Sequence, residues 1–300
     1  MRDSTSSVRD LSLETTGIER IPVRPSRLPR PLRSRQTLVL TVLACASVAV
    51  VYWSSLVSLV SVWSTQNHRH GFLVAGAAAW LLWRNRDQYP EDTNPGSWWG
   101  VLLLSLCVWG WIVARISLVG SLEHLTLLLS FGAATLAVVG WQSFRAMTFP
   151  FFFLLLAFPV GDSLIPALMA STADIAEGLA RAVDLPLYRH GSVMVLPGGT
   201  FEIADVCAGF SQLSTGVIIG TLFAYLTFRK VVNRILFVLA MTGVLVVENG
   251  VRAFLIMAIA SASNMKYLGG SDHITFGWIL FGLTLFAMLW AGRHAAGREH

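Results

Sequence analysis

Eight long runs of mostly apolar residues divide the sequence, and they constrain the fold more than any other feature. The hydrocarbon layer of a membrane holds no water to bond backbone N–H and C=O groups, so a chain crosses it as a helix of about 20 apolar residues. We therefore predict an all-α polytopic integral membrane protein with about eight transmembrane helices. The runs lie at residues 38–62, 70–84, 98–118, 121–141, 146–162, 208–228, 234–256 and 274–292.

The composition excludes an ordinary soluble domain. Hydrophobic residues make up 54% of the chain and charged residues only 13%, whereas about a quarter of the residues in soluble domains are charged. The net charge of +5 does not indicate nucleic-acid binding, because the Lys and Arg residues form short clusters between apolar runs, as cytoplasmic loops do. Three cysteines do not make a disulfide framework.

The positions of the basic clusters predict the orientation of the chain. They alternate from loop to loop as eight spans require, and the positive-inside rule then places both termini in the cytoplasm. Residues 163–207 and 257–273 fall on the outer side. The clusters are Arg24, Arg27, Arg30, Arg33 and Arg35, then Arg84 and Arg86, then Arg145, then Arg229, Lys230 and Arg234, and finally Arg293 and Arg298.

The two ends of the chain differ from the middle in composition. Residues 1–36 are polar and rich in Pro and Arg, so we expect a disordered cytoplasmic tail. The first apolar run begins too late and is too long for a cleaved signal peptide, which predicts a retained signal anchor. We therefore divide the chain into the tail, a transmembrane domain at residues 37–293 and a cytoplasmic C-terminal tail at residues 294–300.

The long outer segment has two patterns of its own. Residues 164–184 place apolar and charged side chains on different faces, which favours a short helix lying in the membrane interface. Residues 193–196 and 201–203 alternate around a Pro-Gly-Gly turn at 197–199, the pattern of a small β-hairpin. This hairpin leads the chain to Cys207 at the start of the sixth run.

Three side chains suited to acyl transfer fall on the predicted outer face. Cys207 begins the sixth run, where a helix N-terminus and a nearby cation lower the pKa of a thiol. His273 precedes the last run and would act as general acid and base. Arg252 lies late in the seventh run and would stabilise an oxyanion or hold an acidic substrate group. Gly209 leaves the first backbone N–H groups of the helix accessible as an oxyanion hole.

Each of these residues also has a purely structural interpretation. Cys207 could be an inert thiol, Arg252 a cation bonded to carbonyls and His273 a cap on the last helix. Glu202 and Asp205 oppose a low thiol pKa because nearby carboxylates favour the neutral thiol, and Asp205 could instead cap the helix.

The remaining candidate groups lack partners for chemistry. Cys45 and Cys107 lie in apolar runs, where thiols pack as small hydrophobes. The His-x-His pattern at residues 67–70 resembles a metal motif, yet no Cys, Asp or Glu lies close to it in the sequence. We therefore predict neither a metal nor a cofactor.

Three segments together resemble the exosortase and archaeosortase family. They are DVCAGFSQLS, ENGVRAF and DHITFG, in this order. The family pattern is a Cys-Ser-Gly box at the start of one span, an Asn-x-x-Arg box late in the next and a His before the last. Residues 207–209, Asn249 with Arg252, and His273 fall on it. The resemblance covers about residues 60–292, with Ala208 where Ser is usual and no basic residue near Gln212.

The resemblance implies a membrane cysteine transpeptidase of the bacterial cytoplasmic (inner) membrane. Its substrates would be secreted proteins held by a C-terminal transmembrane helix that follows a short sorting signal such as PEP-CTERM. Cys207 would form a thioester with His273 and Arg252 as partners, supported by Gly209, Asn249 and Asp205. The acyl group would then pass to water, an amine or a hydroxyl, such as a cell-surface or exopolysaccharide acceptor. Transfer and hydrolysis both stay open.

A second class of function is a transporter or a polysaccharide-export component. In that case Arg252 and His273 would line a substrate path. Transporters usually place their site near the midplane between related halves, and we detect no internal repeat in the sequence. This observation favours the enzyme.

The predicted orientation is tested by reporter fusions at Gly198 and at the C-terminus. We expect a reporter active only outside the cytoplasm to work at Gly198, and one active only inside to work at the C-terminus, because the Arg clusters alternate. Cytoplasmic activity of a Gly198 fusion would remove the shared outer face, and with it the proposed grouping of Cys207, Arg252 and His273.

Overall fold

The computed structural model describes residues 31–65, 67–89, 96–159, 161–197, 199–203, 208–263, 266–267 and 272–297, without the side chains of residues 31–34 and 88. The predicted disordered tail lies outside the described residues as far as residue 30. The first helix begins at Pro31, inside the segment assigned to that tail. Residues 298–300 of the predicted C-terminal tail also lie outside the described part of the chain.

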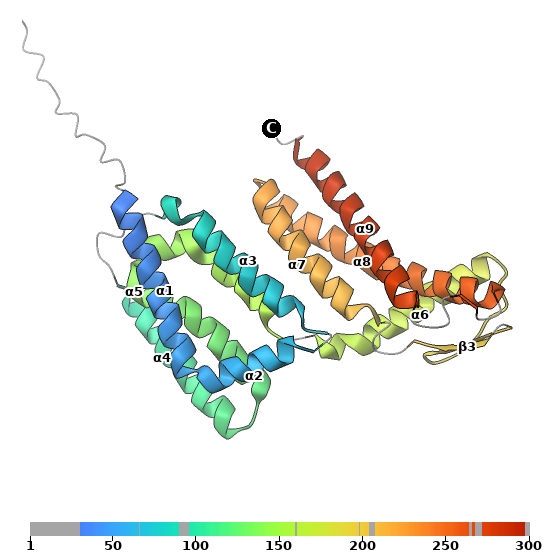
Figure 1. Cartoon of the computed structure of the whole chain (residues 1–300), viewed down its shortest axis with the longest axis horizontal. Coiled ribbons are helices and arrows are strands. Elements are labelled where there is room, and N and C mark those ends of the chain that lie inside the picture. Colours follow the sequence, from blue (N-terminus) through green and yellow to red (C-terminus); the bar gives the residue numbers. More distant parts are fainter. Residues whose placement is uncertain are drawn as a thin grey trace, which may run out of the picture.

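The described chain is mostly helical, with one small sheet (Figure 1). The α-helices are α1 (Pro31–Val51), α2 (Trp53–Trp63), α3 (His70–Arg84), α4 (Trp98–Ile116), α5 (Gly120–Leu154), α6 (Ile165–Ala182), α7 (Phe210–Thr227), α8 (Val231–Ala262) and α9 (Asp272–Gly297). The 3-10 turns are η1 (Arg86–Gln88), η2 (Leu155–Ala157) and η3 (Asp162–Leu164). The strands are β1 (Tyr188–His190), β2 (Val193–Leu196) and β3 (Gly199–Glu202).

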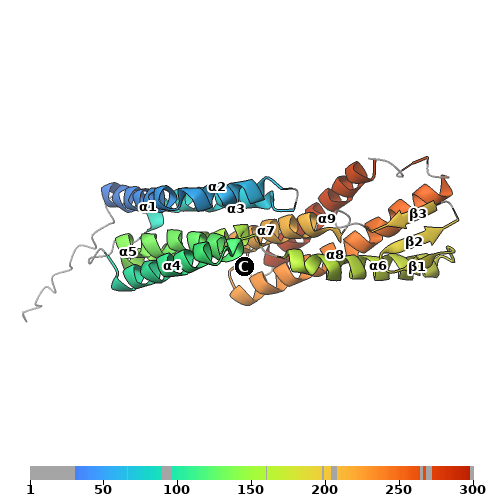
Figure 2. The same cartoon turned by 90° about the horizontal axis from the view of Figure 1, so that it is seen from below.

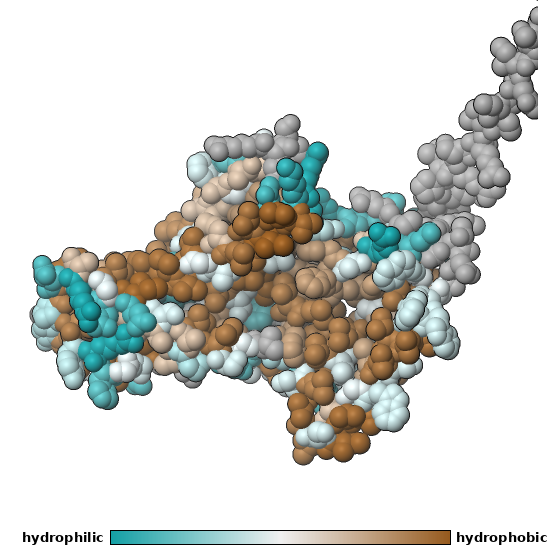
Figure 3. Space-filling view, turned by 180° about the vertical axis from the view of Figure 1, so that it is seen from behind, coloured by the Kyte–Doolittle hydropathy of each residue, from teal (hydrophilic) through white to brown (hydrophobic). Residues whose placement is uncertain are grey.

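Several helices are long and apolar enough to cross a membrane. Within the described residues there are five, or six if α1 and α2 form one broken span. The protein is therefore a polytopic membrane protein, and the number of eight spans stays a prediction. Figure 3 shows hydrophobic side chains over much of one face, with hydrophilic ones gathered at the end that carries the sheet.

The first predicted span is not one straight helix. The segments Arg35–Val51 and Trp53–Trp63 meet at an angle of 90°. Tyr52, which separates them, has φ −98° and ψ 26° and is 2% exposed. Its ring packs against Trp111 at 4.9 Å, and its hydroxyl accepts a hydrogen bond of 3.3 Å from Ser130. No Pro or Gly lies at the bend to account for it. The packing of Tyr52 is the structural feature that we find there.

Helix α5 folds back on itself. Gly140 has φ 80° and ψ 173°, which interrupts the helical backbone. A Cβ on Gly132 would lie 3.9 Å from Cβ of Phe151, although a straight helix would separate these residues by about 28 Å. The stacked rings of Phe144 and Phe151, 5.6 Å apart, lie in the same contact. The two arms thus form a hairpin over the predicted runs at 121–141 and 146–162.

The helices form two groups that meet along α7 (Figure 1). Helices α1 to α5 make one group, and α7 to α9 with α6 and the sheet make the other. Ile218 of α7 lies in the same apolar cluster as Val74 of α3 and Leu127 of α5. Tyr225 of α7 stacks on Phe149 of α5 at 3.5 Å. These contacts hold the middle and the C-terminal part of α7 against the first group.

The sheet is antiparallel with the order β1-β2-β3, and it lies beside α6 (Figure 2). Leu196 pairs with Gly199 across the tight turn between β2 and β3, and Tyr188 of β1 pairs with Val195. The sequence pattern predicted the two strands around this turn but not β1. Arg189 of β1 donates to Asp174 of α6 at 2.6 Å, a hydrogen bond that raises the pKa of the guanidinium. The interfacial position of α6 stays a prediction.

The hairpin in α5 makes Gly140 a sensitive position. We expect Gly140→Ala to lower the free energy of unfolding by about 1–3 kcal/mol, because only glycine tolerates this backbone conformation readily. Gly243→Ala is the matched control, since a Cβ there has no neighbour within 4 Å and Ala favours a helix over Gly. Thermal unfolding in detergent measures both, and equal midpoints for the two variants would contradict the strained turn.

Candidate active site

The predicted nucleophile lies in a gap of the described chain. Cys207 and Asp205 are outside the described residues, which end at Ile203 and resume at Ala208. Ala208 is 2% exposed and Phe210 5%, so the chain enters α7 at a buried place. The described residues that lie nearest to Cys207 on its C-terminal side in the sequence are those at the start of α7.

Gly209 shapes the entry into α7. It has φ 76° and ψ 9°, a left-handed backbone, and its carbonyl accepts the hydrogen bond of Leu213 N–H at 2.9 Å. A Cβ at this position would lie 2.5 Å from Cγ of Asn249. Glycine is thus required both by the backbone angle and by the close approach of α8. The N–H groups of the following turn have no acceptor within the helix.

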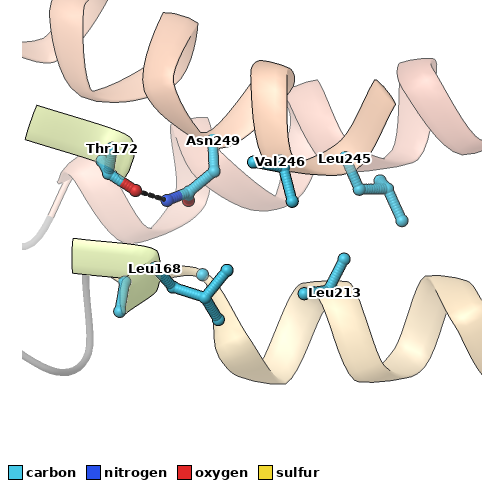
Figure 4. Close-up of a pocket in the computed structure, with 8 residues that line it drawn as sticks. Leu168, Thr172, Leu213, Leu245, Val246 and Asn249 are labelled. Atoms are coloured by element: carbon cyan, nitrogen blue, oxygen red, sulfur yellow. Dashed lines mark hydrogen bonds between the residues drawn. The ribbon is translucent and has the colours of Figure 1, made fainter. Parts of the chain in front are cut away.

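Asn249, the first residue of the predicted Asn-x-x-Arg pattern, lies against this turn. Its side chain is buried in the middle of α8, and its Nδ2 donates to Oγ1 of Thr172 on α6 at 2.7 Å. Figure 4 shows this hydrogen bond at the edge of a small pocket. The pocket is mostly apolar and opens beside the start of α7. Its lining residues are Leu168, Thr172, Ala208, Gly209, Leu213, Leu245, Val246 and Asn249.

Arg252 is held where three helices meet. Its Nη1 donates to Oε1 of Gln212, in the first turn of α7. Gln212 is 8% exposed, and its Nε2 donates to the carbonyl of Gly277 on α9 at 3.3 Å. A Cβ on Gly277 would lie 2.9 Å from Nη1 of Arg252. The guanidinium therefore packs closely against the α9 backbone at Gly277.

His273 lies one turn from this contact. It is the second residue of α9 and is half-buried. Residues four apart share a helix face, so His273 is on the face of α9 that Gly277 turns toward Arg252. One turn is about 5.4 Å along the axis. The structure thus brings Arg252 and the His273 turn to the first turn of α7, five residues after Cys207.

Sequence reasoning missed three residues of this site. Gln212 and Thr172 hold Arg252 and Asn249, and Gly277 leaves room for the guanidinium. Gln212 carried a signal, because a polar residue in an apolar run is a functional candidate by default. Thr172 and Gly277 carried none, since their partners are 77 and 65 residues away.

The remaining predictions concern Glu202, a bound metal ion and the thiols of Cys45 and Cys107. Glu202 is exposed at the end of β3. In the described part of the chain no three His, Cys, Asp or Glu side chains gather to hold a metal ion, and the absence of a metal stays a prediction. Cys45 and Cys107 are half-buried free thiols. Cys45 lies 3.7 Å from the hydroxyl of Thr135.

One comparison with known proteins identifies a family. The family model described as transmembrane exosortase matches residues 62–290. This match covers α3 to α9 up to residue 290 and includes every residue of the candidate site. Neither the curated proteins nor the solved structures contain a match to the chain.

The close contact at Gly209 predicts the effect of a single methyl group. We expect Gly209→Ala to lower the free energy of unfolding by about 1–2 kcal/mol from the left-handed backbone alone, and by a further part from displacing Asn249. Gly191→Ala is the matched control, because Gly191 has φ +65° with no neighbour within 4 Å of a Cβ. Thermal unfolding in detergent gives the difference. If Gly209→Ala costs no more than Gly191→Ala, Asn249 does not restrain this turn.

Proposed function

The chain belongs to the transmembrane exosortase family, and we propose that it is a sortase-like cysteine transpeptidase with Cys207 as its nucleophile. Membership supports a membrane transpeptidase that acts on secreted proteins carrying sorting signals. We assign the cleavage to C-terminal signals of the PEP-CTERM type at the outer face of the cytoplasmic membrane. Both termini are then cytoplasmic.

The observation that carries the proposal is the meeting of α7, α8 and α9 around Arg252. Arg252 of α8 and Gly277 of α9 both contact Gln212, which lies in the first turn of α7. His273 is one turn along α9 from Gly277, and Cys207 lies three residues before the first residue of α7 in the sequence. A cation on α8 and a candidate general base on α9 thus come to the start of α7, three residues after the proposed nucleophile in the sequence, which a structural role for each residue would not require.

The residues suit the two half-reactions of acyl transfer. In the first, the Cys207 thiolate attacks the scissile carbonyl carbon, a C–S bond forms and the carbonyl oxygen becomes an oxyanion. Arg252 and the first N–H groups of α7 stabilise that oxyanion. The C–N bond then breaks, and His273 gives its proton to the leaving amine. The acyl group stays on Cys207 as a thioester, while the anchor helix is released.

In the second half-reaction, an acceptor attacks the thioester. His273 takes the proton of an amine, a hydroxyl or water, the new bond to the acyl carbon forms, and the Cys207 thiolate leaves. Gln212 contributes by fixing the guanidinium of Arg252, so that the donor geometry is set before substrate arrives. A substrate held by a transmembrane helix presents its scissile bond just above the lipid, at the predicted depth of Cys207.

Substitution of the nucleophile tests the proposal. We expect Cys207→Ala and Cys207→Ser to insert normally and to leave substrate uncleaved, because neither provides a nucleophile that His273 can ionise readily. His273→Ala should slow cleavage by about a hundredfold to ten-thousandfold through loss of proton transfer. The measurement is the size, in cells, of a secreted protein from the same proteome that ends in a transmembrane helix, with enzyme levels checked by immunoblot.

The same experiment contains its control. Cys45→Ala and Cys107→Ala should cleave the substrate at the normal rate, because these thiols only pack between helices. Normal cleavage by a well-expressed Cys207→Ala protein would refute the transpeptidase reaction.

A further inference from the structure

A buried histidine outside the described site contacts the first residue of α7. His68 lies in the turn between α2 and α3 and is 5% exposed. Its Nε2 is 3.3 Å from Oδ1 and 3.4 Å from Oδ2 of Asp162. Its Nδ1 is buried and has no hydrogen-bond partner among the described residues. The sequence pattern at residues 67–70 showed the histidine, but Asp162 is 94 residues away.

Gly161 and His68 both contact the ring of Phe210. Gly161, directly before Asp162, has φ +109°, and a Cβ there would lie 2.6 Å from Cε2 and 2.8 Å from Cζ of Phe210. The imidazole of His68 meets the same ring edge to face, with the ring centroids 6.0 Å apart. The aromatic ring therefore contacts both the Gly161 backbone and the imidazole, and the contact between His68 and Asp162 joins these two elements.

The turn that carries His68 is also held by a hydrogen bond to the segment that precedes Asp162. The indole N–H of Trp63 donates to the carbonyl of Ala157 at 2.8 Å. Gly71 lets α3 pass against that indole, since a Cβ there would lie 2.5 Å from Cδ2 of Trp63. The backbone on either side of His68 is thus anchored, and His68 has little freedom to follow Phe210 if α7 moves.

Phe210 lies close in the sequence to the proposed nucleophile. It is the first residue of α7, is 5% exposed and packs with Ile165 and Ala208. It follows Cys207 by three residues, with Ala208 and Gly209 between them. The helices that carry Arg252 and His273 belong to the same group as α7, whereas His68 belongs to the other group. A fixed N-terminus of α7 is therefore needed to bring thiol, cation and imidazole into register.

We propose that His68 and Asp162 are positioning residues that hold Phe210, and through it the segment carrying Cys207, in the geometry required for attack. The inference rests on the proposed function. A pair that acts through Phe210 rather than on the reacting atoms should, when removed, lower kcat and leave KM nearly unchanged. A small misplacement of a reacting group can cost about a hundredfold in rate.

The test compares His68→Gln, Asp162→Asn and the double variant with wild type. Arg69→Gln is the matched control, because Arg69 is the exposed neighbour of His68. One readout is cleavage of a peptide substrate by purified enzyme in detergent, analysed as kcat and KM. The other is the rate at which iodoacetamide alkylates Cys207 in a Cys45→Ala/Cys107→Ala background, which reports the position of the thiol without any substrate.

We expect each single variant to lose about tenfold or more in kcat with KM within about twofold. The double variant should be no slower than the worse single variant, because the two residues act as one pair. The alkylation rate of Cys207 should change by about threefold or more in these variants and stay unchanged in Arg69→Gln. Asp162→Asn carries the test if His68→Gln does not fold, since the Asp162 side chain is 66% exposed.

Three results would overturn the inference. They are folded Asp162→Asn protein with wild-type kcat and alkylation rate, a rise in KM at unchanged kcat, and losses in the two single variants that multiply in the double variant. Failure of the proposed function is separate: wild type would then leave the peptide uncleaved, or Cys207→Ala would cleave it. The alkylation rates would still decide the role of the His68 and Asp162 pair.

Discussion

The hydrogen bond from Arg252 to Gln212 is the interaction on which the candidate site depends. Arg252 belongs to a helix that is long and apolar enough to cross a membrane, where a charged side chain is costly unless polar groups surround it. Gln212 accepts from the guanidinium and donates to α9, so one carboxamide links α7, α8 and α9. The need to solvate the cation thereby brings Arg252, the first turn of α7 and Gly277 of α9 together.

Small residues decide how closely these helices approach. Gly209 admits the carboxamide of Asn249, and Gly277 admits the guanidinium of Arg252. A third close contact, Gly216 against Leu245, lies deeper between α7 and α8. Close approach at small residues is the usual way for helices to pack in a membrane, where the hydrophobic effect between helices is absent. The polar contacts of the site therefore lie between helices that are tightly packed against one another.

The site lies where the two groups of helices meet, and this position has a mechanical consequence. The N-terminus of α7 contacts α8 through Gly209 and the α2–α3 turn through Phe210. The start of α7 is thus restrained from both groups. The sheet and α6 complete the other side, because Thr172 of α6 holds Asn249, and the buried Met194 and Leu196 of β2 pack in the same cluster as Ala173. Movement of one group relative to the other would therefore shift the start of α7.

The sequence by itself determined the helical membrane class, the extent of most helices and the residues of the three boxes. Apolar length and the positions of chemically useful side chains are local properties, and they can be read without knowing the fold. It also predicted separate runs on either side of residue 142, where the structure has a hairpin at Gly140.

Only the tertiary structure decided the bend at Tyr52, the third strand and the partners of the site residues. Ser130, Thr172 and Asp162 contact Tyr52, Asn249 and His68 across 78, 77 and 94 residues. No periodicity or motif encodes such contacts, because they depend on which helix faces come together. The side chains of the candidate site therefore come from short sequence segments, whereas their arrangement in space arises from packing between residues far apart in the chain.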